Sequence, residues 1–241
     1  MSVRAANPEA SAFHTTRWTR VCLAREDSDH GRQALADLCD AYYEPVVTFL
    51  RVVLRDADAA RETSHAFFEQ MLGGGTIWHA DPRRGRFRSY LLGAVKHFLS
   101  HQRQAAARLK RGGGVEQVSM DATGQLKNVE DGNLAPDAEF DRQWAITVMA
   151  RAMDALEAEC TADGEGDFFT AVRGILGGQA DRGAMTQLAV ERGMSFDALR
   201  VAVHRMRRRL RDCVKAEVAG TLEDPATVQE EMEALFSALG K

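Results

Sequence analysis

The sequence predicts an all-α protein built as two small helical domains joined by a flexible linker. Its 241 residues include only 5 prolines and 3 tyrosines, whereas Ala, Leu, Arg and Glu, which favour helices, are abundant. No sustained run alternates apolar and polar residues, the pattern of a half-buried strand. A hydrophobic content of 45% and a charged content of 27% are typical of an ordinary globular protein.

The N-terminal part divides into a disordered lead-in, residues 1–12, and a first helical domain, residues 13–111. Apolar periodicity predicts its helices over residues 16–24, 31–55 and 57–72, and either one long helix or a helix-turn-helix over residues 87–111. Pro45 interrupts the second of these patterns, because proline cannot donate a helical hydrogen bond. We therefore expect a bend, or the first turn of a new helix, at Pro45.

The C-terminal part comprises a linker, residues 112–139, a second domain, residues 140–217, and a helical tail, residues 218–241. Gly, Asp, Asn and Gln without sustained periodicity indicate the linker. Apolar periodicity predicts helices over residues 140–159 and 168–176. The tail is amphipathic, and we expect it to pack against the preceding domain. Shielding of a DNA-reading helix, or contact with a partner, is the alternative role for the tail.

Residues 185–211 have the order of parts of a helix-turn-helix. Gly193 ends a first helix that covers residues 185–192, and Ser195 occupies the N-cap position of a second. The second helix has a single apolar stripe, formed by Leu199, Val203, Met206 and Leu210, and arginines cover much of the rest. In such motifs the second helix enters the DNA major groove. A solvated basic face is the alternative interpretation.

The distribution of charge favours a polyanionic partner although the net charge is −4. Residues 81–111 contain nine basic residues and only one acidic residue, Asp81. A second basic block runs from Arg200 to Lys215. The acids gather between and after these blocks. Two basic blocks on an acidic chain indicate two separate contacts with nucleic acid.

Several other classes of protein are not supported by the sequence. No apolar run approaches the length of a membrane span and no signal peptide is recognisable, so we expect a cytoplasmic protein without membrane contact. Cys22, Cys39, Cys160 and Cys213 are scattered, as buried thiols are. His97 and His101 have the spacing of a chelating pair but no third ligand nearby. We expect no metal, no cofactor and no catalytic residue.

Six phrases in the chain, in order and over nearly its whole length, resemble those of a known family. They are FHTTRW (13–18), DPRRGRFRSYLL (81–92), VKHFL (95–99), LKRGGG (109–114), FDRQWA (140–145) and VAVHRMRRR (201–209). The family is the extracytoplasmic-function (ECF) class of bacterial RNA polymerase sigma factors, in the branch common in planctomycete-like genomes. The resemblance implies a promoter-specificity subunit whose partners are core RNA polymerase and promoter DNA, with an anti-sigma factor as a further candidate.

The resemblance implies that the C-terminal domain reads the −35 element. Residues early in the second helix would approach bases, and later arginines would hold phosphate. The base-reading candidates are Ser195, Arg200, His204 and Arg205, and the phosphate-binding candidates are Arg207, Arg208, Arg209 and Arg211.

The N-terminal domain would open the −10 element and bind the polymerase clamp. The −10 candidates are Arg86, Arg88, Lys96, His97, His101, Arg103, Lys110 and Arg111. Phe87 and Tyr90 are either flat surfaces for unstacked bases or core residues. The polymerase-binding candidates are Glu62, His65, Phe67 and Phe68.

The chain departs from the family at two expected working surfaces. His65 and Ala66 stand where relatives have a Gln-Glu pair, and Arg103-Gln104 replaces a Trp-Asp pair. These departures support an alternative function, that of a sigma-derived helix-turn-helix regulator acting without core polymerase. A protein-interaction module with merely solvated basic surfaces is the third class.

Overall fold

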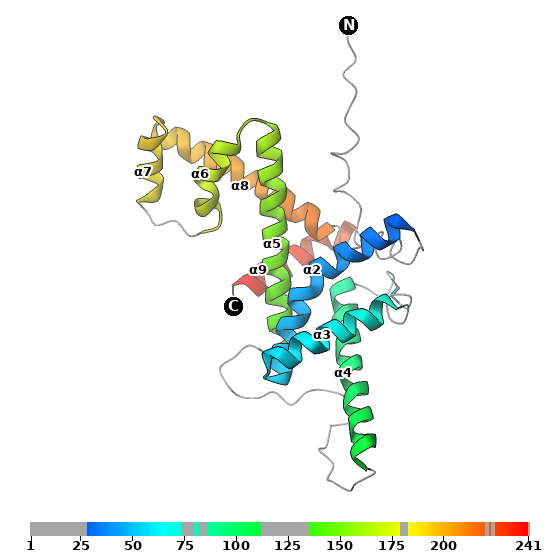
Figure 1. Cartoon of the computed structure of the whole chain (residues 1–241). Coiled ribbons are helices and arrows are strands. Elements are labelled where there is room, and N and C mark those ends of the chain that lie inside the picture. Colours follow the sequence, from blue (N-terminus) through cyan, green and yellow to red (C-terminus); the bar gives the residue numbers. More distant parts are fainter. Residues whose placement is uncertain are drawn as a thin grey trace. The chain divides into compact units, whose positions relative to one another are not determined.

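The computed structural model describes residues 28–73, 80–81, 86–111, 135–178, 183–219, 222 and 225–240. Eight α-helices and one short 3-10 helix occur in these ranges (Figure 1), and no strand does, which confirms the all-α prediction. The predicted lead-in, the predicted helix over 16–24, the phrase at 13–18 and most of the predicted linker lie outside the described residues.

The chain divides into two compact units. The first unit comprises Met1–Ala145 and Gly220–Lys241, and the second unit comprises Ile146–Ala219. The division falls inside helix α5 (Pro136–Ala162) and not at the predicted boundary after residue 139. The C-terminal tail belongs with the first unit, so our expectation that it packs against the preceding domain is wrong.

Helices α2 (Asp29–Leu54) and α3 (Ala57–Leu72) begin at capped positions of the first unit. The Oγ of Ser28 accepts a hydrogen bond from the Gly31 N–H at 3.0 Å. A carboxylate oxygen of Asp56 accepts from the N–H groups of Asp58 and Ala59 at 2.9 and 3.0 Å. Each cap satisfies amide donors that the first helical turn leaves without a partner.

Pro45 lies inside an uninterrupted helix, so the expectation that a new helix begins there is wrong. Proline costs about 3 kcal/mol in a helix interior because one hydrogen bond is lost. The apolar stripe continues in register on both sides of it, with Leu38, Tyr42, Val46 and Phe49 all buried. Burial of large apolar side chains contributes about 1.5–3 kcal/mol each, which outweighs the lost hydrogen bond.

Helix α4 (Phe87–Arg111) is joined to α2 and α3 by aromatic contacts. The rings of Phe87 and Tyr42 meet edge to face with centroids 5.2 Å apart, and those of Phe98 and Phe67 do so at 5.6 Å. Phe87 is 1% exposed, so of its two interpretations the structure supports the core residue. The same contacts place α3 against α4 through the core of the first unit.

The tail folds as a 3-10 turn, Pro225–Thr227, followed by helix α9 (Val228–Leu239). Its buried face consists of Val228, Glu231, Met232 and Leu235. Glu231 is fully buried and pairs with Arg86 and Arg88 of the first unit. Local periodicity predicted the helix correctly, but the partners of its buried face and of Glu231 are far away in the sequence, so it did not predict which unit the helix joins.

The second unit contains the rest of α5 with α6 (Gly166–Leu176), α7 (Ala184–Glu191) and α8 (Phe196–Ala219). Between α7 and α8, Gly193 has a φ of +62°, which L side chains rarely adopt. The N–H groups of Gly193 and Met194 donate to the carbonyls of Val190 and Ala189 at 3.1 and 2.9 Å, a Schellman motif. Gly193 therefore ends α7 as predicted.

Ser195 caps α8 as predicted, since its Oγ accepts a hydrogen bond from the Ala198 N–H at 3.2 Å. The predicted apolar stripe is buried in the second unit and continues beyond Arg211 through Cys213, Val214 and Val218. Helix α8 is therefore longer than the sequence pattern indicated.

Candidate nucleic-acid interface

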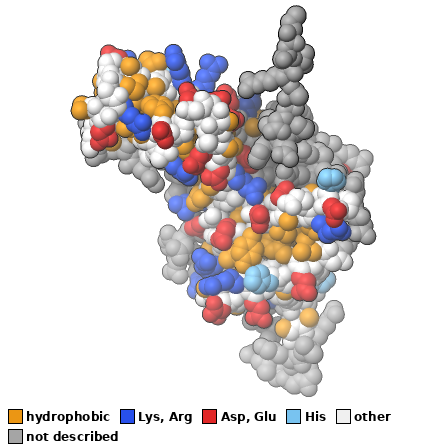
Figure 2. Space-filling model, turned by 45° about the horizontal axis from the view of Figure 1, so that its top comes forward, with side chains coloured by type: hydrophobic (Ala, Val, Ile, Leu, Met, Phe, Trp, Pro, Cys, Tyr) orange, Lys and Arg blue, Asp and Glu red, His pale blue; other side chains and the backbone are white. Residues whose placement is uncertain are grey.

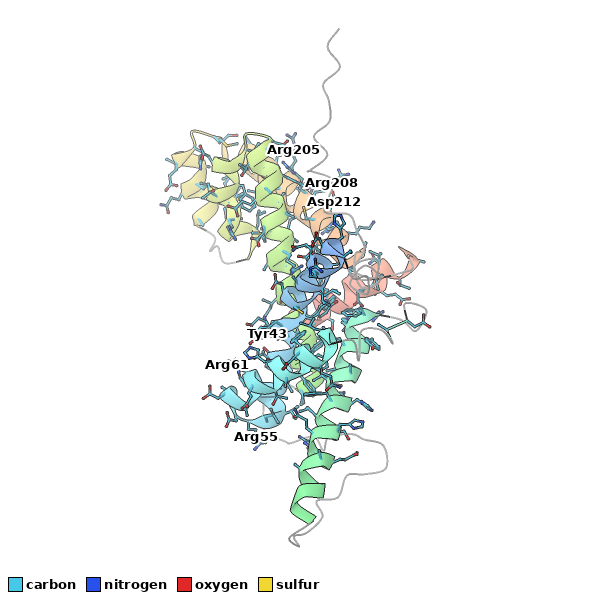
Figure 3. All side chains as sticks on the ribbon, turned by 45° about the vertical axis from the view of Figure 1, so that its right-hand side comes forward. Tyr43, Arg55, Arg61, Arg205, Arg208 and Asp212 are labelled. Carbon is cyan, nitrogen blue, oxygen red and sulfur yellow. The ribbon has the colours of Figure 1, made fainter. Side chains whose placement is uncertain are left out.

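The face of α8 opposite its buried stripe carries a row of exposed side chains, most of which are basic. We call this set the outer face of α8; all its members are exposed and recur at helical spacings of three, four or seven residues from Arg208. They are Val201, His204, Arg205, Arg208, Arg211, Asp212 and Lys215. Figure 3 shows Arg205, Arg208 and Asp212 following one another along the helix.

The arginines of the outer face are available to a ligand. Among the described residues, Arg205, Arg208 and Arg211 form no ion pair, whereas Arg200 and Arg209 do. Figure 2 shows Lys and Arg side chains projecting from the surface of the part that contains α6, α7 and α8. Each guanidinium presents several fixed donors that match the geometry of a phosphate or a guanine edge.

The first turns of α8 hold two of the predicted base-reading residues. The Arg200 guanidinium lies 3.4 Å from Asp197, and both side chains are largely exposed. Such a surface pair contributes little energy and opens readily. Ser195 is exposed, but its hydroxyl oxygen serves the helix cap, so its established part is structural.

Arg209 turns toward acids of its own unit. Its guanidinium nitrogens lie 2.7 Å from Glu165, 2.9 Å from Asp163 and 3.6 Å from Glu159. Three carboxylates around one guanidinium satisfy its donors and leave no phosphate-binding face. The predicted phosphate contact at Arg209 is therefore corrected to an internal ion-pair network.

Arg207 is likewise used within the second unit. Its guanidinium donates to the backbone carbonyl of Ile175, in the last turn of α6, at 3.3 Å. A cation at this position interacts favourably with the carbonyls that a helix end leaves unpaired. Arg207 thus links α8 to α6, and because its side chain is exposed the predicted phosphate contact stays a prediction.

Arg86 and Arg88, at the start of α4, were predicted to contact the −10 DNA. In the structure both form ion pairs with acidic residues of the first unit. Arg88 is 8% exposed, lies with its guanidinium 4.6 Å from the Trp144 ring centre, and pairs with Asp141 and Glu231. Arg86 is 3.0 Å from Glu231. Arg88 is therefore not accessible to DNA here, and its predicted −10 role is corrected.

Two further predicted −10 residues on α4, Lys96 and Arg103, differ in whether an acidic side chain of the protein already binds them. The Nζ of Lys96 lies 2.6 Å from an Asp137 carboxylate oxygen, which competes with any phosphate. Arg103 is exposed and forms no ion pair with a described residue. The side chains of Lys110 and Arg111 lie outside the described residues.

His97 and His101 meet on the exposed side of α4. Their Nε2 atoms are 3.1 Å apart and their ring centres 4.3 Å. No group of three or more His, Cys, Asp or Glu side chains suited to a metal ion occurs in the described ranges. The two ring planes are inclined at 59°, so the imidazoles form an exposed polar pair and not one flat surface.

Two of the four predicted polymerase-binding residues on α3 are exposed to solvent, and the other two are buried. Glu62 and His65 are exposed, whereas Phe67 and Phe68 are 1% and 6% exposed and belong to the core. Burial in the core corrects the roles predicted for Phe67 and Phe68, because a buried ring offers no surface to a partner.

His65 is held by Tyr43 of α2, which Figure 3 labels. The Tyr43 hydroxyl and the His65 Nε2 are 2.9 Å apart, and the two rings stack with centroids 5.8 Å apart. The pair contributes an ordered polar surface where α2 and α3 meet.

Val201 and Lys215 belong to the outer face of α8 but were missed by the sequence analysis. Val201 is uncharged, and Lys215 lies beyond the periodic pattern that ends at Arg211. Counting seven residues to either side of Arg208 would have found both positions. Tyr43 was missed because only the packing of α2 on α3 brings it to His65.

Comparisons with protein-family models, with curated proteins and with solved structures give no match to this chain. Within the described ranges, no helix has the length and apolar character needed to cross a membrane.

Proposed function

We propose that this protein binds duplex DNA through the outer face of α8 and acts as a bacterial sigma factor. The observation that carries the DNA-binding part is the contrast between the arginines of α8. Arg205, Arg208 and Arg211 have no ion pair among the described residues, whereas Arg209 is neutralised by acids of its own unit. Unpaired guanidiniums on one helix face are suited to a polyanion.

The geometry of α8 fits the major groove. A single α-helix fills that groove, and its N-terminal residues reach base edges when the preceding helix crosses the backbone. In this arrangement Arg200, His204 and Arg205 approach bases, and Val201, which is 47% exposed, suits contact with a thymine methyl group. Arg208, Arg211 and Lys215, further along, hold phosphates.

The role as a sigma factor rests on the six colinear phrases and on the exposed polar residues of the first unit. Glu62 and His65 would bind core RNA polymerase, and His97, His101 and Arg103 would face the −10 element. Two adjacent exposed imidazoles, and an arginine without an ion pair among the described residues, suit unstacked bases and their backbone. An anti-sigma factor is a further partner that the resemblance implies.

A specific observation favours a second candidate, a sigma-derived regulator that binds DNA without polymerase. Two of the four predicted polymerase-binding residues, Phe67 and Phe68, are in the core, and His65 is engaged by Tyr43. Of the predicted polymerase-binding residues only the polar Glu62 and His65 therefore face solvent, whereas the arginines of the outer face of α8 are all exposed.

Co-purification with bacterial core RNA polymerase, followed by run-off transcription from genomic fragments, tests the proposal. A sigma factor gives a stable complex and discrete transcripts, and these are lost in Arg205→Ala/Arg208→Ala but kept in Arg173→Ala. Arg173 is a suitable control because it is an exposed arginine of the same unit that pairs with Glu157. Salt-sensitive duplex binding without a polymerase complex would establish the regulator instead. Unchanged binding in the double variant would contradict both.

A further inference from the structure

Helix α9 supplies carboxylates to the arginines at the start of α4. One oxygen of Glu231 lies 2.5 Å from the Arg88 Nε, and the other lies 3.1 Å from an Arg88 terminal nitrogen and 3.0 Å from the Arg86 Nε. Glu230 adds a contact at 3.5 Å to Arg86. Glu231 thus binds both arginines, and Glu230 binds Arg86 in addition.

The ion pairs of Glu231 with Arg86 and Arg88 lie within the packed interior of the first unit. Glu231 is 0% exposed, and a carboxylate taken fully out of water is stable only when charged donors compensate it. Three apolar residues of α9, Val228, Met232 and Leu235, are buried beside it. Apolar burial therefore holds the helix in place while the two arginines neutralise its buried charge.

A carboxylate on a guanidinium occupies the position that a phosphate would take. Both anions accept two parallel hydrogen bonds from the guanidinium fork, so one excludes the other. Arg86 keeps about a third of its side chain exposed, and its described partners are Glu230 and Glu231 only. Arg88 also has Asp141 and Trp144, so it would retain partners if α9 left.

We propose that α9 is an intramolecular acidic strap that occupies the anion-binding arginines of the first unit and limits nucleic-acid binding there. The competitor is the phosphate backbone, so the inference rests on the proposed function. Removal of the negative charges of Glu230 and Glu231 leaves Arg86 without its described partners. Arg88 loses Glu231 but keeps Asp141 and Trp144. The first unit then gains phosphate-binding side chains that ion pairs with α9 occupy in the intact chain.

Glu231→Gln and Glu233→Gln form the matched pair that tests the strap. Both remove one negative charge from α9, but Glu233 lies on the exposed side and is contacted by Gln229 at 3.1 Å. Each is placed in a chain carrying Arg205→Ala/Arg208→Ala/Arg211→Ala, which removes the outer face of α8. Binding of fluorescein-labelled oligo(dT) is followed by fluorescence anisotropy over a series of KCl concentrations.

The Glu231→Gln chain is expected to bind more tightly than the Glu233→Gln chain at low salt. The slope of log affinity against log salt should steepen by about 0.7 for each arginine released, and so by about 0.7–1.4. Arg86→Ala should abolish most of this gain. Equal affinities and slopes for the two glutamine variants would overturn the strap.

Glu230→Gln keeps the inference testable if Glu231→Gln does not fold. Glu230 is exposed, so its substitution leaves the buried face of α9 intact while weakening the hold on Arg86. A smaller gain over Glu233→Gln is expected, and no gain would overturn the proposal. The proposed function is judged separately, by whether the triple α8 substitution weakens duplex binding of the full chain. The two ideas therefore fail independently.

Discussion

The guanidinium of Arg88 lies 4.6 Å from the centre of the Trp144 ring, which is itself 1% exposed. Arg88 thus joins α4 to α5 through the ring and to α9 through Glu231. A cation stacked on a buried indole and paired with two carboxylates is part of the architecture of the first unit.

Arg88→Met is expected to destabilise the first unit by about 3–5 kcal/mol, because Glu231 would remain buried with a single partner. Arg88→Met/Glu231→Met should recover part of that loss, since it removes both charges together. Urea unfolding of the two variants and of Arg142→Met, an exposed position on α5, provides the measurement and its control. Equal stability of Arg88→Met and Arg142→Met would contradict a structural role for Arg88.

Gly193→Ala should destabilise the second unit by about 1–2 kcal/mol, because alanine is strained at a φ of +62°. No heavy atom lies within 4 Å of the added Cβ, so the cost arises from the backbone alone. Gly174→Ala is the matched control, since Gly174 is helical and equally uncrowded. It should stabilise the protein by about 0.5–1 kcal/mol. Thermal unfolding of both variants checks the opposite signs, and a shared sign would contradict the turn geometry.

Arg205→Ala is expected to lower the affinity for duplex DNA, whereas Arg209→Ala is expected to lower the stability of the fold. Arg205→Ala should weaken duplex binding by about 1–3 kcal/mol and relax sequence preference if Arg205 reads a base, with the unfolding midpoint unchanged. Arg209→Ala should leave DNA affinity nearly unchanged and lower stability, because Glu159, Asp163 and Glu165 would then repel one another. Electrophoretic mobility shift and thermal unfolding on the same preparations test the pair. A larger binding defect in Arg209→Ala would reverse our assignment.

The raised pKa values of Cys39 and Cys213 predict that the free energy of unfolding falls in alkaline solution. Burial raises the pKa of Cys213 from 9.0 to about 11, with a contribution from Glu159, and burial with Asp40 does the same for Cys39. Above pH 9 the unfolded chain releases these protons while the folded chain retains them, so the free energy of unfolding falls between pH 9 and pH 11. It is unaffected by these groups below pH 9.

Urea unfolding at pH 8 and pH 10 measures this effect. Lysine and tyrosine titrate in the same range, so the informative quantity is the difference between the wild type and Cys39→Ala/Cys213→Ala. The variant is expected to lose less stability between the two pH values. An identical loss would show that the folded state does not disfavour the thiolates.

Local features of the second unit were predictable because each depends on a few neighbouring residues. The φ of Gly193 and the cap at Ser195 follow from the turn chemistry of their own positions. The buried stripe of α8 follows from helical spacing, so Leu199, Val203 and Met206 were correctly placed in the core. Pro45 shows the limit of such reasoning, because the packing of α2 outweighs the propensity of one residue.

The all-α class, most helix positions and the concentration of arginine on α8 can be inferred from the amino-acid sequence alone. Which of these arginines are available to a ligand depends on how the helices pack. Arg88 and Glu231 are 143 positions apart, and Arg209 and Asp163 are 46 apart, so no local pattern reports either pair. Helices form through hydrogen bonds between residues four apart, whereas charge is neutralised by whichever group folding brings within about 4 Å.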